Sequence, residues 1–263
     1  MGEVYGARVR PRRRWGRRLL ITFIVLVLLI GAALAVADRV AASYAERTIS
    51  DRVAEQVANQ KATSEQPAVT IEGFPFLTQV ARGVYHEIKI ELKDFSGPAG
   101  DGRTIRMKLL DVRANDVKAP LDTIRSGNGA ITAGSVTGTG LVDYSQLTEL
   151  VGQPGVKLGE KDGKLVGSAP VQVLGKTVTL SGTASLTVKG GVVQVRFSDV
   201  KAAGLPDNAV VRGLVNSYVQ RLAFDLTVPP LPLDLKVQKV EAQADGLRIT
   251  AGATDVALNA SGV

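Results

Sequence analysis

The longest apolar stretch of the chain runs from Leu19 to Ala37 and contains no charge and one polar residue, Thr22. As a helix that rises about 1.5 Å per residue, it extends roughly 28 Å, close to the hydrocarbon thickness of a bilayer. Seven arginines and one acidic residue precede it, and cationic flanks stay on the cytoplasmic side. We therefore expect a basic cytoplasmic tail over 1–18, a membrane segment over 19–37 and all later residues outside the cytoplasm.

The apolar segment is open to two interpretations. A small-residue site, Ala35-Val36-Ala37, lies directly before Asp38, as in a cleavable signal peptide. The apolar core is, however, longer than the roughly 7–15 residues of an ordinary signal peptide, which favours a retained anchor. The protein is thus either a single-pass membrane protein or a protein secreted to the cell envelope after cleavage near Ala37.

After Ala37 the hydrophobic pattern becomes that of an amphipathic helix. Apolar residues over 38–62 fall near a helical repeat at Val40, Tyr44, Ile49, Val53 and Val57. We expect this helix to continue from the membrane segment and to lift the following domain off the membrane surface. Together with a break at 63–67, residues 38–67 form an amphipathic helix and linker.

Residues 68–263 are predicted to form one α+β domain, because short alternating segments dominate and helical patterns are few. Within 103–117 the apolar positions change phase near Leu109-Leu110, which suggests a bulge there. Glycines scattered through the strands favour a long, curved, mostly antiparallel sheet that wraps around a helix. The predicted strands are 68–72, 84–94, 103–117, 130–142, 155–160, 164–174, 177–188, 192–200, 234–244 and 247–258. The predicted helices are 76–82, 120–124, 146–151 and 208–224, followed by an extended, proline-rich segment over 228–233.

The net charge of +7 belongs to the tail and not to the domain. Of 32 basic and 25 acidic residues, seven basic and one acidic precede residue 38, which leaves 25 basic and 24 acidic residues in the remainder. A basic tail beside a membrane segment faces anionic lipid, so nucleic acid is not a predicted partner. The chain has no cysteine, which excludes disulfides, thiol catalysis and lipoprotein acylation.

The candidate catalytic motifs in the sequence do not meet the residue requirements of their reactions. The single histidine, His86, lies in an alternating strand, where a surface ring is the simpler interpretation. No Gly-x-Ser-x-Gly elbow is present, and Gly175-Lys176-Thr177 has Pro170 where a phosphate loop needs glycine. No His, Asp or Glu cluster has metal-ligand spacing. We predict no catalytic residue, no metal and no cofactor; carboxylates that meet only in three dimensions remain the one route to an enzyme.

One block of the chain carries a family resemblance. The residues are Gly73-Phe74-Pro75-Phe76-Leu77-Thr78-Gln79, followed by Gly83 and a charged alternating strand, with a second match at Leu231-Pro232-Leu233 and over 246–256. Across about 41–258 the chain resembles the actinobacterial phospholipid-binding proteins typified by lipomannan elongation factor A. The resemblance implies a tubular lipid-binding-like fold with an apolar groove, phospholipid as the ligand in the cell envelope, and no catalytic residues to carry over. One member of that family supports elongation of lipoglycan mannan chains.

Apolar residues in two segments are candidates for lipid contact, although each is also compatible with ordinary core packing. At the mouth of a groove or at the bilayer we expect Phe74, Phe76, Leu77 and Val80, and along its wall Val211, Leu214, Val215, Tyr218 and Leu222. The predicted function is an extracytoplasmic phospholipid-binding protein that holds or transfers lipid in envelope and lipoglycan assembly. The alternative is a non-catalytic envelope scaffold for a protein partner such as a glycosyltransferase.

Overall fold

The computed structural model describes residues 15–98, 104–126, 129–151, 155–173, 176–189, 192–202, 213, 224–227 and 235–258. The helices are α1 (Trp15–Asn59), α2 (Phe76–Arg82), α3 (Leu121–Ser126) and α4 (Tyr144–Val151). The strands are β1 (Ala68–Glu72), β2 (Val84–Pro98), β3 (Thr104–Lys118), β4 (Thr132–Val142), β5 (Lys157–Lys161), β6 (Lys164–Val173), β7 (Lys176–Lys189), β8 (Val192–Ala202), β9 (Phe224–Thr227), β10 (Lys236–Gln243) and β11 (Gly246–Ala257).

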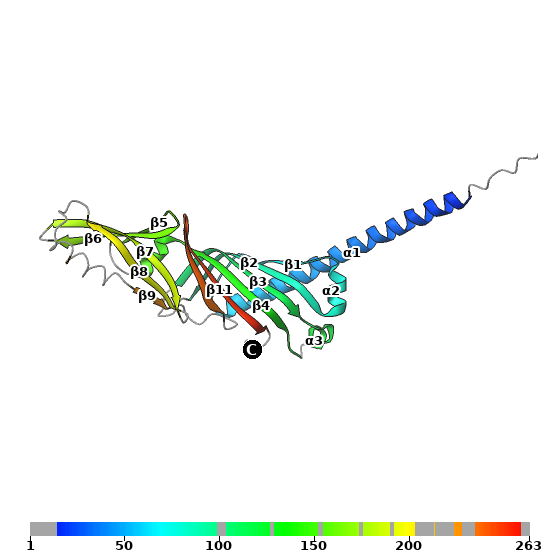
Figure 1. The fold of residues 1–263 in the computed structure, drawn as a ribbon. Helices are drawn as coiled ribbons and strands as arrows, with labels where there is room; N and C mark the ends of the chain where they lie inside the picture. Colours follow the sequence, from blue (N-terminus) through cyan, green and yellow to red (C-terminus); the bar gives the residue numbers. More distant parts are fainter. Residues whose placement is uncertain are drawn as a thin grey trace, which may run out of the picture.

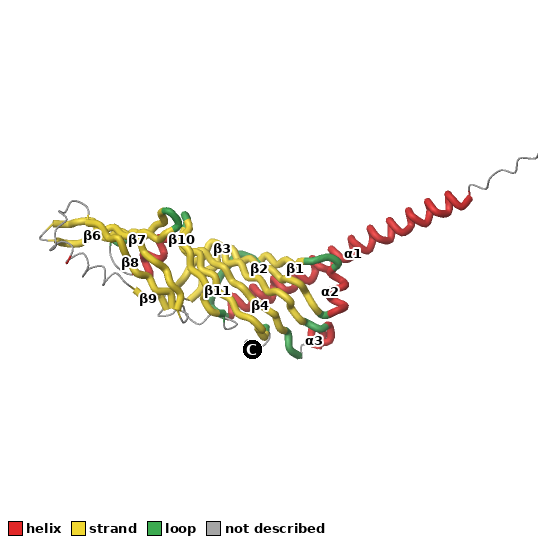
Figure 2. The backbone as a smooth tube through the Cα atoms, in the orientation of Figure 1, coloured by secondary structure: helices red, strands yellow, loops and turns green. Residues whose placement is uncertain are grey.

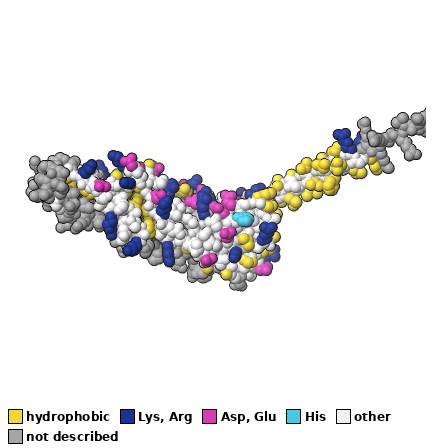
Figure 3. All heavy atoms as spheres, viewed as in Figure 1, with side chains coloured by type: hydrophobic (Ala, Val, Ile, Leu, Met, Phe, Trp, Pro, Cys, Tyr) yellow, Lys and Arg dark blue, Asp and Glu magenta, His cyan; other side chains and the backbone are white. Residues whose placement is uncertain are grey.

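Helix α1 is a single rod of 45 residues that joins the apolar segment to the domain. Its first half projects away from the sheets, with hydrophobic side chains on its surface (Figures 1 and 3). Among the described residues it is the one helix long and apolar enough to cross a membrane, by length and composition. The helix passes Ala37 without a break, so the predicted continuation is confirmed.

Two antiparallel sheets follow. The first has the strand order β1-β2-β3-β4-β11-β10, and the second has the order β5-β6-β7-β8-β9. The six-stranded sheet curves around the second half of α1, and the five-stranded sheet lies at the far end of the molecule (Figures 1 and 2). An apolar N-terminal helix followed by a mostly antiparallel α+β domain confirms the predicted fold class.

Strand register explains why the six-stranded sheet has one apolar face. Because side chains alternate along a strand, paired residues in neighbouring strands share a face. One row across the sheet is Val69, Ile90, Val112, Gly138 and Ala251, and the next is Leu92, Leu110, Gly140, Ile249 and Val240. A third row is Ile71, Ile88, Ala114, Val136 and Ala253. We call this apolar surface, which faces α1, the inner face.

The opposite face of the sheet is charged. Arg113 lies 2.9 Å from Asp111 and 3.4 Å from Glu87, and Lys89 lies 3.6 Å from Asp111. Lys89 also forms a short hydrogen bond to Glu91, which raises the pKa of Lys89 above its ordinary value. Such partly exposed pairs add little stability, so their main effect is to keep this face in water.

Helix α1 packs on the inner face through small residues. Ala42 is 2% exposed within a core cluster that includes Ile71, Val117 and Val136, and Ala41, Ala45 and Ile49 pack against it. The expected apolar face of this helix was therefore wrong at Val40 and Tyr44, which are 65% and 74% exposed. Three of the four residues of α1 in this contact are alanines, so small side chains make most of it. This half of α1 therefore packs with one side against the sheet, and its lifting the domain off the membrane stays a prediction.

Aspartates with positive φ change the phase of the long strands. Asp94, Asp116, Asp199 and Asp255 have φ values between 47° and 53°, a left-handed conformation that Asp tolerates better than most residues. Strand β2 pairs Lys93 with Leu109 and Phe95 with Met107 in one register. The predicted bulge at Leu109-Leu110 is therefore wrong: the strand register does not shift there, and the phase changes at the kink of Asp94.

The other predicted elements match the structure within a few residues, with one omission. Strand β9 begins at Phe224, where we expected the end of a helix over 208–224. Except for Gly213 and Phe224, that helix lies outside the described residues, as does the extended segment 228–233.

Candidate functional site

Part of the inner face belongs to neither of the two hydrophobic clusters that the described residues form. Two hydrophobic clusters lie along the molecule, one around Ala42 and Val136 and the other around Val142 and Leu165. Between them, Val69, Ile90 and Leu110 belong to neither cluster and are half-buried. Each of them shares the inner face by register. Apolar side chains on a concave surface that remain partly open provide what an acyl chain needs.

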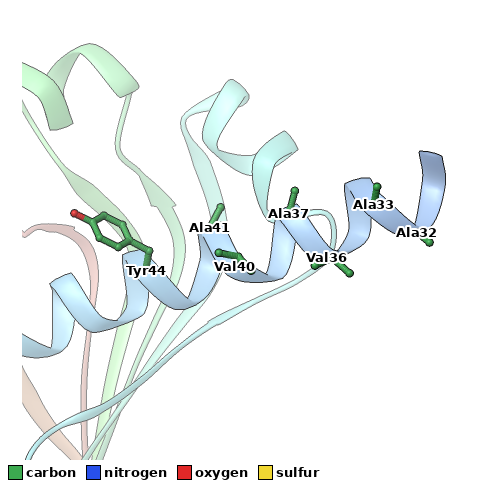
Figure 4. A pocket seen from close by; sticks show the side chains of 7 residues that line it. All are labelled: Ala32, Ala33, Val36, Ala37, Val40, Ala41 and Tyr44. Atoms are coloured by element: carbon green, nitrogen blue, oxygen red, sulfur yellow. The ribbon is translucent and has the colours of Figure 1, made fainter. Parts of the chain in front are cut away.

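A second apolar surface, shallow and open, lies along α1. We call it the α1 groove; its lining residues are Ala32, Ala33, Val36, Ala37, Val40, Ala41 and Tyr44 (Figure 4). Ala32 lies at the membrane end of the groove and Tyr44 at the domain end (Figure 4). The groove is open and crosses Ala37, where the apolar segment ends. It therefore continues the apolar surface of the membrane segment along α1 as far as Tyr44.

The first residue after the apolar segment fixes α2 to α1. Asp38 is 2% exposed, and its carboxylate accepts hydrogen bonds from the backbone N–H of Phe76 at 3.0 Å and of Leu77 at 2.8 Å. These N–H groups belong to the first turn of α2, where they have no partner within the helix. A carboxylate also complements the positive end of the helix. The Gly73–Gln79 block is thus attached to the point where α1 leaves the domain.

Arg39 completes this attachment. Its guanidinium donates to the Asp38 carboxylate at 2.9 Å and to the carbonyl oxygen of Gly73 at 3.4 Å. It also lies 5.5 Å from the centre of the Phe74 ring, within cation–π range. Desolvation by burial would raise the pKa of Asp38, but the hydrogen bonds from Leu77, Arg39 and Phe76 outweigh it, so that this pKa lies below its ordinary value.

The predicted contact residues near α2 divide into two groups. Phe76 is 5% exposed and packs in the core, with its ring centroid 6.2 Å from that of Tyr85, and Val80 is half-buried against the same cluster. Phe74 and Leu77 are 66% and 44% exposed. Contact of these four residues with lipid stays a prediction. The predicted wall residues Val211, Leu214, Val215, Tyr218 and Leu222 lie outside the described residues.

Sequence reasoning missed the α1 groove and the open part of the inner face. Alanines at Ala33, Ala37 and Ala41 recur every four residues, a signal that one side of the helix is smooth, whereas the predicted apolar face rests on larger side chains. The inner-face rows follow from register, which the sequence alone does not supply for strands far apart in the chain.

Other features of the described residues do not form a comparable site. His86 is exposed on β2, as its alternating strand predicted. A cavity of about 20 Å³ near Gly167, Gly182 and Phe197 holds no more than a water molecule. No group of three or more His, Cys, Asp or Glu side chains that could hold a metal ion occurs in the part of the chain that the structure describes.

A partly open apolar face on a curved sheet fits a ligand with apolar chains. The comparison with protein families agrees: the chain belongs to the LmeA-like phospholipid-binding family, whose model matches residues 36–252. Comparisons with curated proteins and with solved structures gave no significant match. The family match begins at Val36, so it includes the half of α1 that packs inside the sheet and leaves out most of the apolar segment.

Proposed function

We propose that this protein holds a phospholipid with its acyl chains between α1 and the inner face of the six-stranded sheet. Two observations support the proposal. An open apolar surface runs along α1 from Ala32 to Tyr44. The inner face, which packs on the same helix, keeps Val69, Ile90 and Leu110 half-open. Membership of a phospholipid-binding family supports this choice of ligand.

In this proposal α1 is a signal-anchor and the domain is extracytoplasmic. The arginine-rich tail over 1–18 stays in the cytoplasm, residues 19–37 cross the membrane, and residues 68–263 form the lipid-binding domain around the second half of α1. The retained anchor is favoured by the continuity of α1 through Ala37, since the same helix forms the membrane segment, the groove and the core. The bound lipid serves envelope assembly, with lipoglycan synthesis as the process that the family resemblance supports. The proposal contains no catalytic step.

The test compares two neighbouring residues on opposite faces of β2. Ile90 lies on the inner face and Glu91 on the charged face, and both are half-buried. Ile90→Trp adds an indole where the acyl chains would lie, whereas Glu91→Trp adds the same bulk outside. The full chain and both variants are purified from membranes, washed with detergent and analysed for retained phospholipid by native mass spectrometry.

We expect wild type and Glu91→Trp to retain phospholipid and Ile90→Trp to retain several-fold less. Lipid belonging to the membrane segment is the same in all three proteins, so the difference reports the domain. Equal retention by all three contradicts a lipid between α1 and the inner face. A well-folded domain without lipid that co-purifies with a glycosyltransferase would instead favour the scaffold alternative.

A further inference from the structure

Exposed large apolar side chains of the domain collect at one end. Outside the apolar segment, those among the described residues are Val40, Tyr44, Phe74, Leu77, Val84, Leu109, Leu121 and Ile124. All except Leu109 lie on α1 just beyond the membrane segment, on α2 and the residues next to it, or on α3. Large apolar groups gathered on one surface mark an interaction site, because scattered exposure is the ordinary case.

Strand pairing places α2 and α3 side by side. Helix α2 ends at Gly83, directly before β2, and α3 begins three residues after β3 ends at Lys118. Strands β2 and β3 pair at that end through Val84 and Lys118, and the N–H of Ala119 donates to the carbonyl oxygen of Gly83 at 2.9 Å. The two helices therefore form one surface, visible in Figure 1 at the end of the domain from which α1 projects. We call it the α2–α3 face and define it by Phe74, Leu77, Leu121 and Ile124.

The attachment of α2 to Asp38 fixes where this face lies relative to a bilayer. The apolar segment ends at Ala37, and the next residue holds the first turn of α2 by two backbone hydrogen bonds. When residues 19–37 span the hydrocarbon, α2 is at headgroup level. The charged residues of α2 and α3 are Arg82, Arg125 and Asp122, all exposed, and Arg39 is half-exposed beside Phe74. Arginines among apolar side chains suit a layer of lipid phosphates above acyl chains. Hydrophobic and basic side chains are mixed at this end of the domain in Figure 3.

We infer that the α2–α3 face is a second membrane contact, which lies in the headgroup layer of the bilayer that α1 crosses and holds the domain against the lipid surface. This inference rests on the membrane anchorage in the proposed function. It adds a fixed orientation: a single helix would let the domain rotate about its axis, whereas a second contact on one side keeps the α1 groove open to the same lipid layer.

The absence of cysteine allows a direct test with single spin labels. The full chain carrying Leu77→Cys, Ile124→Cys or Ser185→Cys is labelled and placed in nanodiscs of phosphatidylcholine and phosphatidylglycerol. All three positions are exposed, so the fold tolerates the label, and Ser185 on β7 is the aqueous control. We expect labels at 77 and 124 to collide several-fold more with oxygen, relative to a water-soluble nickel chelate, than the label at 185. Equal accessibility at the three positions overturns the inference.

A label at Thr78 tests the cause of the contact. In a protein that also carries Phe74→Asp and Ile124→Asp, we expect the accessibility of the label at Thr78 to the nickel chelate to rise to that of the label at Ser185. The circular dichroism spectrum should stay unchanged. If accessibility does not change, the apolar residues do not make the contact and the inference is wrong.

The same nanodiscs separate this inference from the proposed function when they contain a photoactivatable phospholipid. If the spin labels are exposed to water but phospholipid is cross-linked to the inner face, the membrane contact is wrong and the proposed lipid binding is supported. Labels in the headgroup layer without cross-links to the inner face support the contact and contradict the proposed function.

Discussion

Charges placed in the α1 groove should slow the passage of lipid without unfolding the protein. Val40 is 65% exposed and Tyr44 is 74% exposed, so Val40→Asp with Tyr44→Glu changes stability by only about 0.5 kcal/mol per site. Full burial of an aliphatic or aromatic side chain contributes about 1.5–3 kcal/mol. An acyl chain that covers the exposed two-thirds or more of each side chain therefore gains roughly 1–2 kcal/mol per residue, and roughly 2–4 kcal/mol for the pair.

Loss of that contact slows lipid exchange between about 30-fold and about 700-fold, at 1.4 kcal/mol per factor of ten. The assay follows a fluorescent phospholipid from donor vesicles into the domain of the full chain held in nanodiscs. The control, Leu109→Asp, changes an exposed apolar residue on β3 that does not line the groove, and it should exchange lipid like wild type. Unchanged exchange in the double variant, with its fold intact, would refute the groove as the lipid path.

Three further predictions concern the fold. Leu165→Ala, at 1% exposure, should lower the free energy of unfolding by about 2–5 kcal/mol in urea, whereas Leu109→Ala should change it by no more than about 0.5 kcal/mol. Asp255, with φ 53°, should tolerate Gly, whereas Val should cost about 1–2 kcal/mol; equal urea midpoints for the two variants would show that the kink is unstrained. The lowered pKa of Asp38 means that its stabilisation is complete above its unfolded pKa of about 3.9 and is lost as pH falls through the folded pKa. The melting temperatures of wild type and Asp38→Asn should therefore converge in acid. A difference in melting temperature that does not change with pH would contradict the stabilising role of the Asp38 carboxylate at the first turn of α2.

The pattern of apolar residues predicted most strands because alternation is local. Ile88, Ile90 and Leu92 alternate with charges, and no distant information is needed to place them on one face. The face of α1 that packs on the sheet was harder to predict, because two sets of residues recur with the helical period. Val40 and Tyr44 carry the bulk, but the closeness of the sheet selects the alanines at 41, 42 and 45 for the contact. Sequence shows size and period, but the position of the sheet determines which of the two sets is buried.

The candidate site was only partly predictable for a related reason. The Gly73–Gln79 block carries the family resemblance and includes the start of α2, whose first turn is hydrogen-bonded to Asp38. That attachment joins residues 38 positions apart, and no local pattern indicates it. The open part of the inner face depends on register across three strands, from Val69 through Ile90 to Val112. Long-range pairing of this kind is fixed by the folded chain and not by any single segment.

Cross-link mapping tests the central claim most directly. The full chain is placed in nanodiscs that contain a phospholipid with a photoactivatable group near the end of an acyl chain, irradiated, digested and analysed by mass spectrometry. We predict adducts on inner-face residues such as Ile90 and Leu110, in addition to those on the membrane segment over 19–37. Adducts confined to 19–37 would contradict the account, because the acyl chain would then never leave the bilayer for the space between α1 and the sheet.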